Sequence, residues 1–190
     1  MKFYTLLLAG TASLCSWAAA AQPQTRVGAT FTADLTYSGN LQPGMGLVLE
    51  RKMTRRSGLE TGIYYRNNPV AFTTFIQIPS AGSFSFNSSL NERFISIPVL
   101  YKFYSRIVNF SVGPTFDFML GWKQTSGRPQ VNIDSYSTSN KFDLGAMLKL
   151  SKQIKLADQW LLEPELRLNP LFSGARIYGG LSIGTRYVLK

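Results

Sequence analysis

The stretch "RVGATFTADLTY", residues 26–37, alternates apolar and polar side chains at twelve successive positions. Val27 and Phe31 fall on one side of an extended chain, and Arg26 and Asp34 fall on the other. Successive side chains of a β-strand point to opposite faces, so a period of two over this length indicates a strand. The pattern alone leaves open whether the apolar side meets a protein core or lipid.

The same alternation recurs seven more times. It predicts strands at 44–53, 58–66, 93–103, 107–122, 141–151, 160–169 and 176–190. Strands of roughly ten residues are long for a soluble sheet and match the length that a tilted membrane strand needs. Eight is also the smallest strand number of outer-membrane barrels. The sequence therefore predicts an all-β fold, an eight-stranded antiparallel up-and-down transmembrane β-barrel.

Residues 1–21 resemble a secretory signal peptide, with Lys2, an apolar run, and small residues before a cut after Ala21. We expect their removal, which leaves 22–190 as one outer-membrane barrel domain without Cys15, the only cysteine. Loss of Lys2 leaves 19 basic and 10 acidic residues, a net charge of +9. Such a balance suits an anionic membrane surface, and export argues against a nucleic-acid partner.

The polar face of the predicted strands carries charges of both signs, which could pair inside a lumen. We predict a lumen charge network of Asp34, Glu50, Glu60, Arg66, Lys102, Asp117, Asp143, Lys149, Glu163, Glu165, Arg167 and Arg186. On lipid, a Lys or Arg at the bilayer midplane costs roughly 2–4 kcal/mol. Glycines on the same face would make room for long side chains in a narrow barrel. We therefore expect the apolar face to point outward.

Aromatic residues sort to both ends of the predicted strands, as two girdles at two membrane interfaces would. We expect Tyr37, Tyr65, Trp122 and Phe142 at the external ends and Tyr101, Phe103, Trp160 and Tyr187 at the periplasmic ends. The connections alternate between long and short, with long external ones at 67–91 and 123–139. This alternation is typical of outer-membrane barrels.

The connection 67–91 is the candidate partner loop. Turn residues from Pro79 to Gly82 predict a projecting hairpin. Its apolar residues are Phe72, Phe75, Ile76, Ile78, Phe84 and Phe86. They could bind a partner by strand addition, or pack over the barrel mouth as a lid, and the sequence does not separate these two interpretations.

The segments "SGLETGIYYR", "RFISIPVLYKFY", "FSVGPTFDFML" and "GGLSIGTRYVLK" resemble the outer-membrane β-barrel domain family common in Bacteroidota, which includes the PorT-like proteins. The resemblance covers essentially the whole chain after residue 21. It implies an outer-membrane location and eight strands, and some members serve in secretion or surface assembly. It assigns no functional residues, and the chain ends "YVLK" without the terminal Phe of the proteobacterial pattern.

The chain has no histidine, which excludes hydrolase sites that need an imidazole base. We expect no catalytic residues, no cofactor and no metal. A carboxylate pair of Glu163 and Glu165 with Asp117 is the alternative to a lumen role, and calcium near Asp134 is the alternative to a plain polar loop. Basic residues at the periplasmic rim, which could attract phosphate groups or an acidic partner, are Arg55, Arg56, Arg106, Lys152, Lys155 and Lys190.

We therefore expect a non-enzymatic protein of the cell outer membrane of a Gram-negative bacterium. It would act as a surface or assembly protein through its extracellular loops, as a monomer in outer-membrane lipid. Its candidate partner is another envelope or secretion protein. The alternatives are a narrow transport pore and a soluble lipocalin-like periplasmic barrel that binds a ligand.

Overall fold

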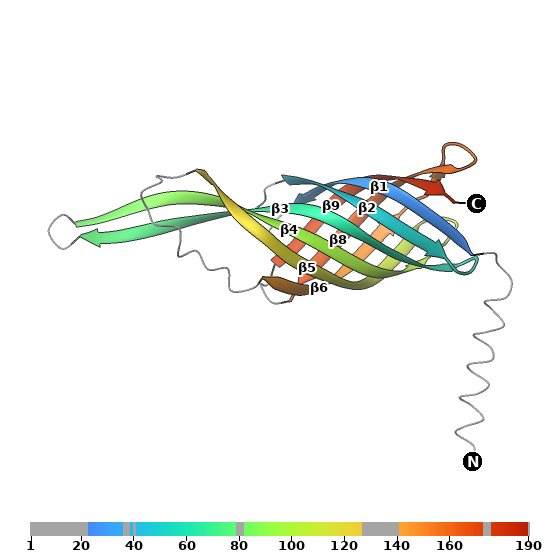
Figure 1. Ribbon diagram of the computed structural model, residues 1–190, viewed down its shortest axis with the longest axis horizontal. Helices are drawn as coiled ribbons and strands as arrows, with labels where there is room; N and C mark the ends of the chain where they lie inside the picture. The colour runs from blue at the N-terminus through green and yellow to red at the C-terminus, as the bar shows by residue number, and fades with distance from the viewer. Residues whose placement is uncertain are drawn as a thin grey trace, which may run out of the picture.

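The computed structural model describes residues 23–35, 39, 41–78, 82–126, 141–172 and 176–189, except for the side chains of 72, 74–78, 82–84, 86 and 126. These residues form one sheet that curves into a barrel (Figure 1). Its strands are β1 (Gln24–Leu35), β2 (Leu41–Lys52), β3 (Ser57–Ile78), β4 (Gly82–Phe103), β5 (Asn109–Ser126), β6 (Phe142–Ser151), β7 (Ile154–Lys155), β8 (Trp160–Leu171) and β9 (Arg176–Val188).

The ring is antiparallel throughout. Strands β1 to β6 pair in chain order, and β8 pairs with β9. Two further pairings close the ring: β9 with β1, where Val188 lies opposite Arg26, and β6 with β8. The two residues of β7 pair with β8 and continue the pairing of β6 with β8 beyond Ser151. The predicted fold class, an eight-stranded antiparallel up-and-down barrel, is confirmed. Among the described residues, no helix is long and apolar enough to cross a membrane.

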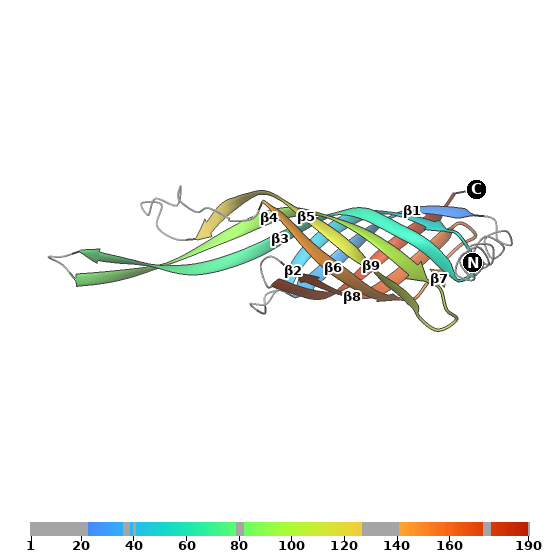
Figure 2. The same ribbon diagram turned by 90° about the horizontal axis from the view of Figure 1, so that it is seen from below.

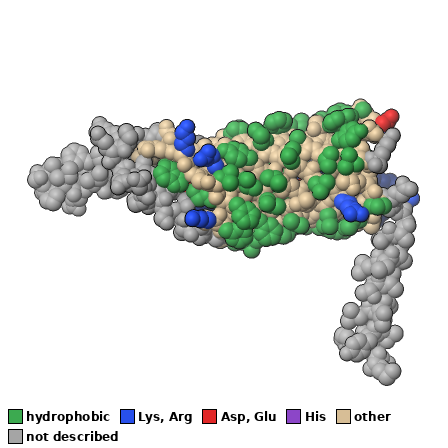
Figure 3. Space-filling model, in the orientation of Figure 1, with side chains coloured by type: hydrophobic (Ala, Val, Ile, Leu, Met, Phe, Trp, Pro, Cys, Tyr) green, Lys and Arg blue, Asp and Glu red, His purple; other side chains and the backbone are tan. Residues whose placement is uncertain are grey.

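Side chains alternate between a polar interior and an apolar exterior. In β1, Thr30 is 1% exposed whereas Phe31 is 66% exposed, and β6 repeats this alternation along its length. The outward-facing hydrophobic residues form the apolar belt (Figure 3). Its members include Phe31, Leu47, Ile63, Phe118, Leu166 and Leu181. The opening stretch therefore turns its apolar side outward, and most of what this barrel buries is polar.

Three strands continue past the barrel (Figures 1 and 2). Strands β3 and β4 have 22 residues each and β5 has 18. The pairing of β2 with β3 ends at Tyr65, and that of β6 with β5 ends at Phe118. Pairing of β3 with β4 runs on to Ile78 opposite Gly82. We call residues 66–78, 82–94 and 119–126 the extension.

In the extension, β3 and β4 are longer than the strands predicted from the sequence. The stretch 67–91 was expected to be a connection that holds a hairpin, and the structure gives both arms a strand backbone. The physical reason is local composition, because Val, Phe, Thr and Ile dominate residues 70–78 and favour extended backbone.

A β-bulge separates the barrel part of β5 from the extension. Phe94 lies opposite Met119 and Arg93 lies opposite Gly121, so Leu120 has no partner on β4. Gly121 has a φ of 146°, a conformation that residues with a side chain rarely adopt. One extra residue reverses the alternation of faces beyond this point.

The bulge changes the position of Trp122. This residue lies opposite Glu92, whose side chain is buried, and residues directly opposite each other share a face of the sheet. The structure therefore places Trp122 on the inner face, whereas the sequence analysis expected it in the outward external girdle. A strict period of two cannot anticipate an inserted residue.

Replacing Gly121 with Ala should destabilise the barrel by about 1–3 kcal/mol, because a Cβ at this φ strains the backbone. Gly179→Ala is the matched control: a Cβ there would approach its nearest neighbour only to 3.7 Å, and its stability should stay the same or rise slightly. Denaturant titration of the folded barrel measures both, and equal stabilities would contradict the bulge.

Candidate functional site

The structure places all twelve residues of the predicted lumen charge network inside the barrel. Each is at most 5% exposed, and together they come from all eight strands of the ring. Carboxylates and cations that are removed from water must pair or pay a large desolvation cost. The stability of the interior therefore depends on which of these charges form ion pairs with one another.

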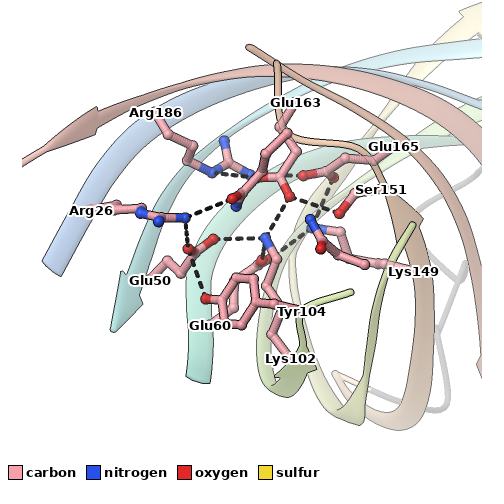
Figure 4. Close-up of polar contacts among 12 residues, drawn as sticks. Arg26, Glu50, Glu60, Lys102, Tyr104, Lys149, Ser151, Glu163, Glu165 and Arg186 are labelled. Carbon is pink, nitrogen blue, oxygen red and sulfur yellow. Dashed lines mark hydrogen bonds and ion pairs between the residues drawn. The ribbon is translucent and has the colours of Figure 1, made fainter. Parts of the chain in front are cut away.

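Lys102 of β4 is the centre of the interior. Its Nζ donates hydrogen bonds to Glu50 at 2.7 Å, Glu60 at 3.0 Å and Glu163 at 2.6 Å. These glutamates come from β2, β3 and β8. One ammonium thus joins carboxylates from three other strands, including the far side of the ring (Figure 4).

Lys149 and Arg186 extend this arrangement. Lys149 Nζ donates to Glu60 at 2.5 Å and lies 2.8 Å from Glu165. Arg186 Nη2 donates to Glu165 at 2.7 Å, and its Nε lies 3.4 Å from Glu163. Charges of opposite sign therefore alternate around a continuous circuit (Figure 4).

Arg26 extends the circuit as a branch through Glu50 and is not part of the predicted network. Its Nη1 donates to Glu50 at 2.7 Å. The alternation of residues 26–37 already put Arg26 on the same face as Asp34, and that signal could have included it. We call Arg26, Glu50, Glu60, Lys102, Lys149, Glu163, Glu165 and Arg186 the central network, four cations and four carboxylates with no net charge.

Neutral hydroxyl groups occupy further carboxylate lone pairs. Ser151 donates to Glu163 at 2.7 Å and Ser182 to Glu165 at 2.9 Å. Tyr104, which follows β4, donates to Glu50 at 2.9 Å. Burial and the Glu50 carboxylate raise the pKa of the Tyr104 phenol, so it remains a donor.

A second cluster lies nearer the extension. Arg167 forms a two-pronged contact with Asp34, with Nε donating to Oδ1 at 2.7 Å. Arg66 Nη1 donates to Asn169 at 2.5 Å and lies 3.6 Å from Asp117. Within the described part of the chain, Arg66 Nε and Nη2 have no hydrogen-bond partner. This cluster is therefore less completely satisfied than the central network.

Tyr64 fills the interior beside Arg167, whose guanidinium lies 5.4 Å from the ring centroid. A Cβ added at Gly46 would lie 2.6 Å from Tyr64 Cδ1. Glycine on the inner face thus makes room for a large side chain from the neighbouring strand. Sequence reasoning anticipated this use of glycine but did not name Tyr64.

Glu92 also escaped the sequence prediction, because it directly follows the stretch taken as a connection. Its buried carboxylate accepts a hydrogen bond from Asn68 at 2.8 Å and another from Arg176 at 3.2 Å. Glu92 and Asn68 lie on β4 and β3 at the boundary between the barrel and the extension, close to the bulge in β5.

The interior chemistry favours a structural role for the carboxylates. Glu163 and Glu165 each contact two cations, and Asp117 lies next to Arg66 instead of joining them. Within the described ranges, no group of three or more Cys, Asp or Glu residues could hold a metal ion. Asp134, the alternative calcium ligand, lies outside the described residues.

Five of the eight predicted girdle residues lie at or near the ends of the observed strands, whereas Tyr65 lies inside the longer β3, where its pairing with β2 ends. Tyr101, Phe103, Trp160 and Tyr187 lie where the short turns are, and Trp160 packs edge-on against Tyr187 at 5.1 Å between centroids. Tyr65 and Phe142 lie toward the extension. Trp122 lies on the inner face as described above, and Tyr37 lies outside the described residues.

The candidate partner residues lie in the extension. The backbone of Phe72, Phe75, Ile76 and Ile78 belongs to β3, and that of Phe84 and Phe86 to β4. Their side chains lie outside the described part of the structure. What the structure gives here is the register of the hairpin, whose β3 edge beyond Tyr65 pairs with no strand within the described ranges.

Comparisons with known proteins show the fold. No protein-family model matches the chain, and no curated protein matches it. The outer membrane protein OprG from Pseudomonas aeruginosa aligns with a TM-score of 0.55 and 10% identity over 89% of this chain and 96% of that one. The N-terminal β-barrel domain of Pseudomonas aeruginosa OprF gives 0.49 and 10%, over 87% and 100%. Neisserial surface protein A gives 0.48 and 12%, over 87% and 96%.

Replacing Lys102 with Met should cost about 3–5 kcal/mol of folding free energy, because three glutamates lose a shared buried partner. The double variant Lys102→Met with Glu60→Gln should recover part of the loss, since the buried charges balance again. Denaturant titration measures both.

Lys155→Met is the control for the loss of a lysine, because its pair with Asp158 is exposed. It should leave the unfolding midpoint unchanged. A Lys102→Met barrel as stable as the Lys155→Met barrel would show that the central network does not hold the ring together.

Proposed function

We propose that this chain is an exported outer-membrane β-barrel protein that acts without catalysis as a surface or assembly protein, through the extension. The carrying observation is that the extension projects from the barrel and that, among the described residues, no strand pairs with its outer edges on β3 and β5. The proposal includes the removal of residues 1–21 as a signal peptide. It also includes a relationship to the PorT-like proteins of Bacteroidota. A monomeric state and a partner among envelope or secretion proteins belong to it as well.

The apolar belt supports the membrane location. Large hydrophobic side chains are exposed on every strand of the ring, a pattern that water would make costly and lipid would favour. The fold shared with OprG, an outer-membrane protein, supports the same location. A soluble lipocalin-like barrel would instead turn its apolar side chains inward.

Leu47→Arg should destabilise the barrel in lipid vesicles by about 2–4 kcal/mol, because it puts a charge in the middle of the apolar belt. Leu156→Arg, in the turn before β8, should be close to neutral. The two leucines are 67% and 60% exposed, so in water both changes would be harmless. Equal stabilities, with no mobility difference between boiled and unboiled samples, would contradict the membrane location.

The extension supports a role in protein interaction. Among the described residues, the pairing of β3 with β2 ends at Tyr65. The pairing of β5 with β6 ends at Phe118, followed only by one backbone hydrogen bond from Met119 to Lys141. Unpaired N–H and C=O groups on such edges can accept an additional strand from a partner. The opposite ends of the strands, joined by short turns, offer no comparable edge in the described structure.

A photo-crosslinking amino acid at Ala71, which is exposed on β3, should give a protein adduct in whole cells, whereas one at Leu166 in the apolar belt should not. Co-expressed unlabelled chain should compete for the adduct. A chain in which a short turn replaces 69–89 should still assemble but should not compete.

The rival function is a narrow transport pore. The central network fills the interior with paired charges, and eight-stranded barrels are ordinarily filled by their own side chains. Steady single-channel conductance in planar bilayers, together with no protein adduct from Ala71, would favour the pore over the proposal.

A further inference from the structure

The charges of this protein are divided between its interior and its ends. Of ten acidic residues, eight are buried in the barrel, Asp158 is exposed, and Asp134 lies outside the described residues. Cations at the short-turn end are Arg51, Lys52, Arg55, Arg56, Arg106, Lys152 and Lys155, and those toward the extension are Arg93, Lys123 and Lys141. Figure 3 shows basic side chains at both ends of the apolar belt and none across its middle on that face.

The cations of the short-turn end line a cleft of about 640 Å³. Lys52, Arg55, Arg56, Arg106 and Lys152 contribute to its walls, and none of the described residues that line it is a carboxylate. The exposed Asp158 lies elsewhere on this end, where it accepts a hydrogen bond from Lys155 at 2.9 Å. Five like charges around one cleft produce a strong positive potential that an anion would neutralise.

Hydrogen bonds fix the turns that carry these cations. Thr54 Oγ1 accepts from the backbone N–H of Ser57 at 2.9 Å, within the turn of Arg55 and Arg56. Lys152 Nζ donates to the carbonyl oxygens of Arg106 at 2.9 Å and Ile107 at 2.7 Å, which ties two turns together. The cations are therefore held near one another despite their repulsion.

The floor of the cleft reaches the central network. Gln153 lines the cleft, and its Oε1 accepts from Arg26 Nη1 at 2.9 Å. Its buried amide nitrogen has no hydrogen-bond partner among the described residues. One residue that lines the cleft thus keeps an unused amide donor beneath the surface, and the guanidinium groups of the walls can bind phosphate oxygens in pairs.

Apolar side chains on the same turns indicate where the anion comes from. Ile107, Ile154 and Leu156 are exposed beside the basic turns, and Phe103 lines the cleft itself. Cations next to exposed apolar side chains match the boundary between acyl chains and headgroups. A site for a soluble anion would need only the cations and not the exposed apolar side chains beside them.

We infer that this cleft binds the phosphate group of an anionic phospholipid in the leaflet next to the short turns. The inference rests on the proposed membrane location. The arginines contact the phosphate oxygens, and the exposed apolar residues of the turns contact the upper acyl chains.

The test uses the purified barrel in nanodiscs of phosphatidylcholine, titrated with short-chain phosphatidylglycerol, short-chain phosphatidylcholine or inorganic tripolyphosphate. Bound molecules are counted by native mass spectrometry. The triple variant Arg55→Gln, Arg56→Gln, Arg106→Gln removes three cations from the cleft. The matched control, Arg93→Gln, Lys123→Gln, Lys141→Gln, removes the same charge from the opposite end.

Phosphatidylglycerol should bind in preference to phosphatidylcholine. The cleft variant should lower its affinity about tenfold, and the control variant by less than about twofold. The replacement of the same three arginines by lysine should keep part of the affinity, because the charge stays and the fork geometry is lost. This variant also covers the case in which the glutamine variant does not fold.

Equal losses in the cleft and control variants would overturn the inference, since only net charge would then matter. Tripolyphosphate that binds the cleft as tightly as phosphatidylglycerol would overturn the lipid source. Capture of an acidic protein at the cleft without lipid preference would overturn it too. A chain that does not enter nanodiscs would refute the proposed membrane location, whereas entry without lipid preference would refute this inference alone.

Discussion

The sharing of the Lys102 ammonium among three glutamates is the interaction on which the rest of the barrel depends. It links β4 to β2, β3 and β8, so it acts across the ring and not only between neighbours. A polar interior is stable only when its charges are paired. That condition requires every strand to be present, requires glycine where large side chains meet, and leaves the outside of the ring for hydrophobic residues.

Because side chains fill the interior, the surfaces that could bind a partner lie at the two ends of the barrel. At one end the sheet continues as the extension, whose outer edges on β3 and β5 pair with no strand in the described part of the chain. At the other end the turns gather cations around a cleft. The two proposed partners differ accordingly: an extended polypeptide at one end, and a phosphate-bearing surface at the other.

The sequence predicted the ring and most of the charges in its interior, because a period of two assigns each residue to a face, but it did not name Arg26, Tyr64 or Glu92. It could not predict which charges pair, since the position of Glu163 beside Lys102 depends on how far the strands are staggered around the ring. Nor could it predict the bulge at Leu120, which moved Trp122 to the inner face. The prediction also assumed strands of the length that a membrane barrel needs, and it therefore made β3 and β4 shorter than they are in the structure.

The pairing of β1 with β9 joins the two ends of the chain, with Arg26 opposite Val188. Contacts this distant in sequence carry a high loop-closure entropy and slow folding. The ring therefore closes only once β9 is available to pair with β1. Until then its charged and apolar faces are both exposed to water, and the chain depends on being kept from aggregation until its C-terminal strand arrives.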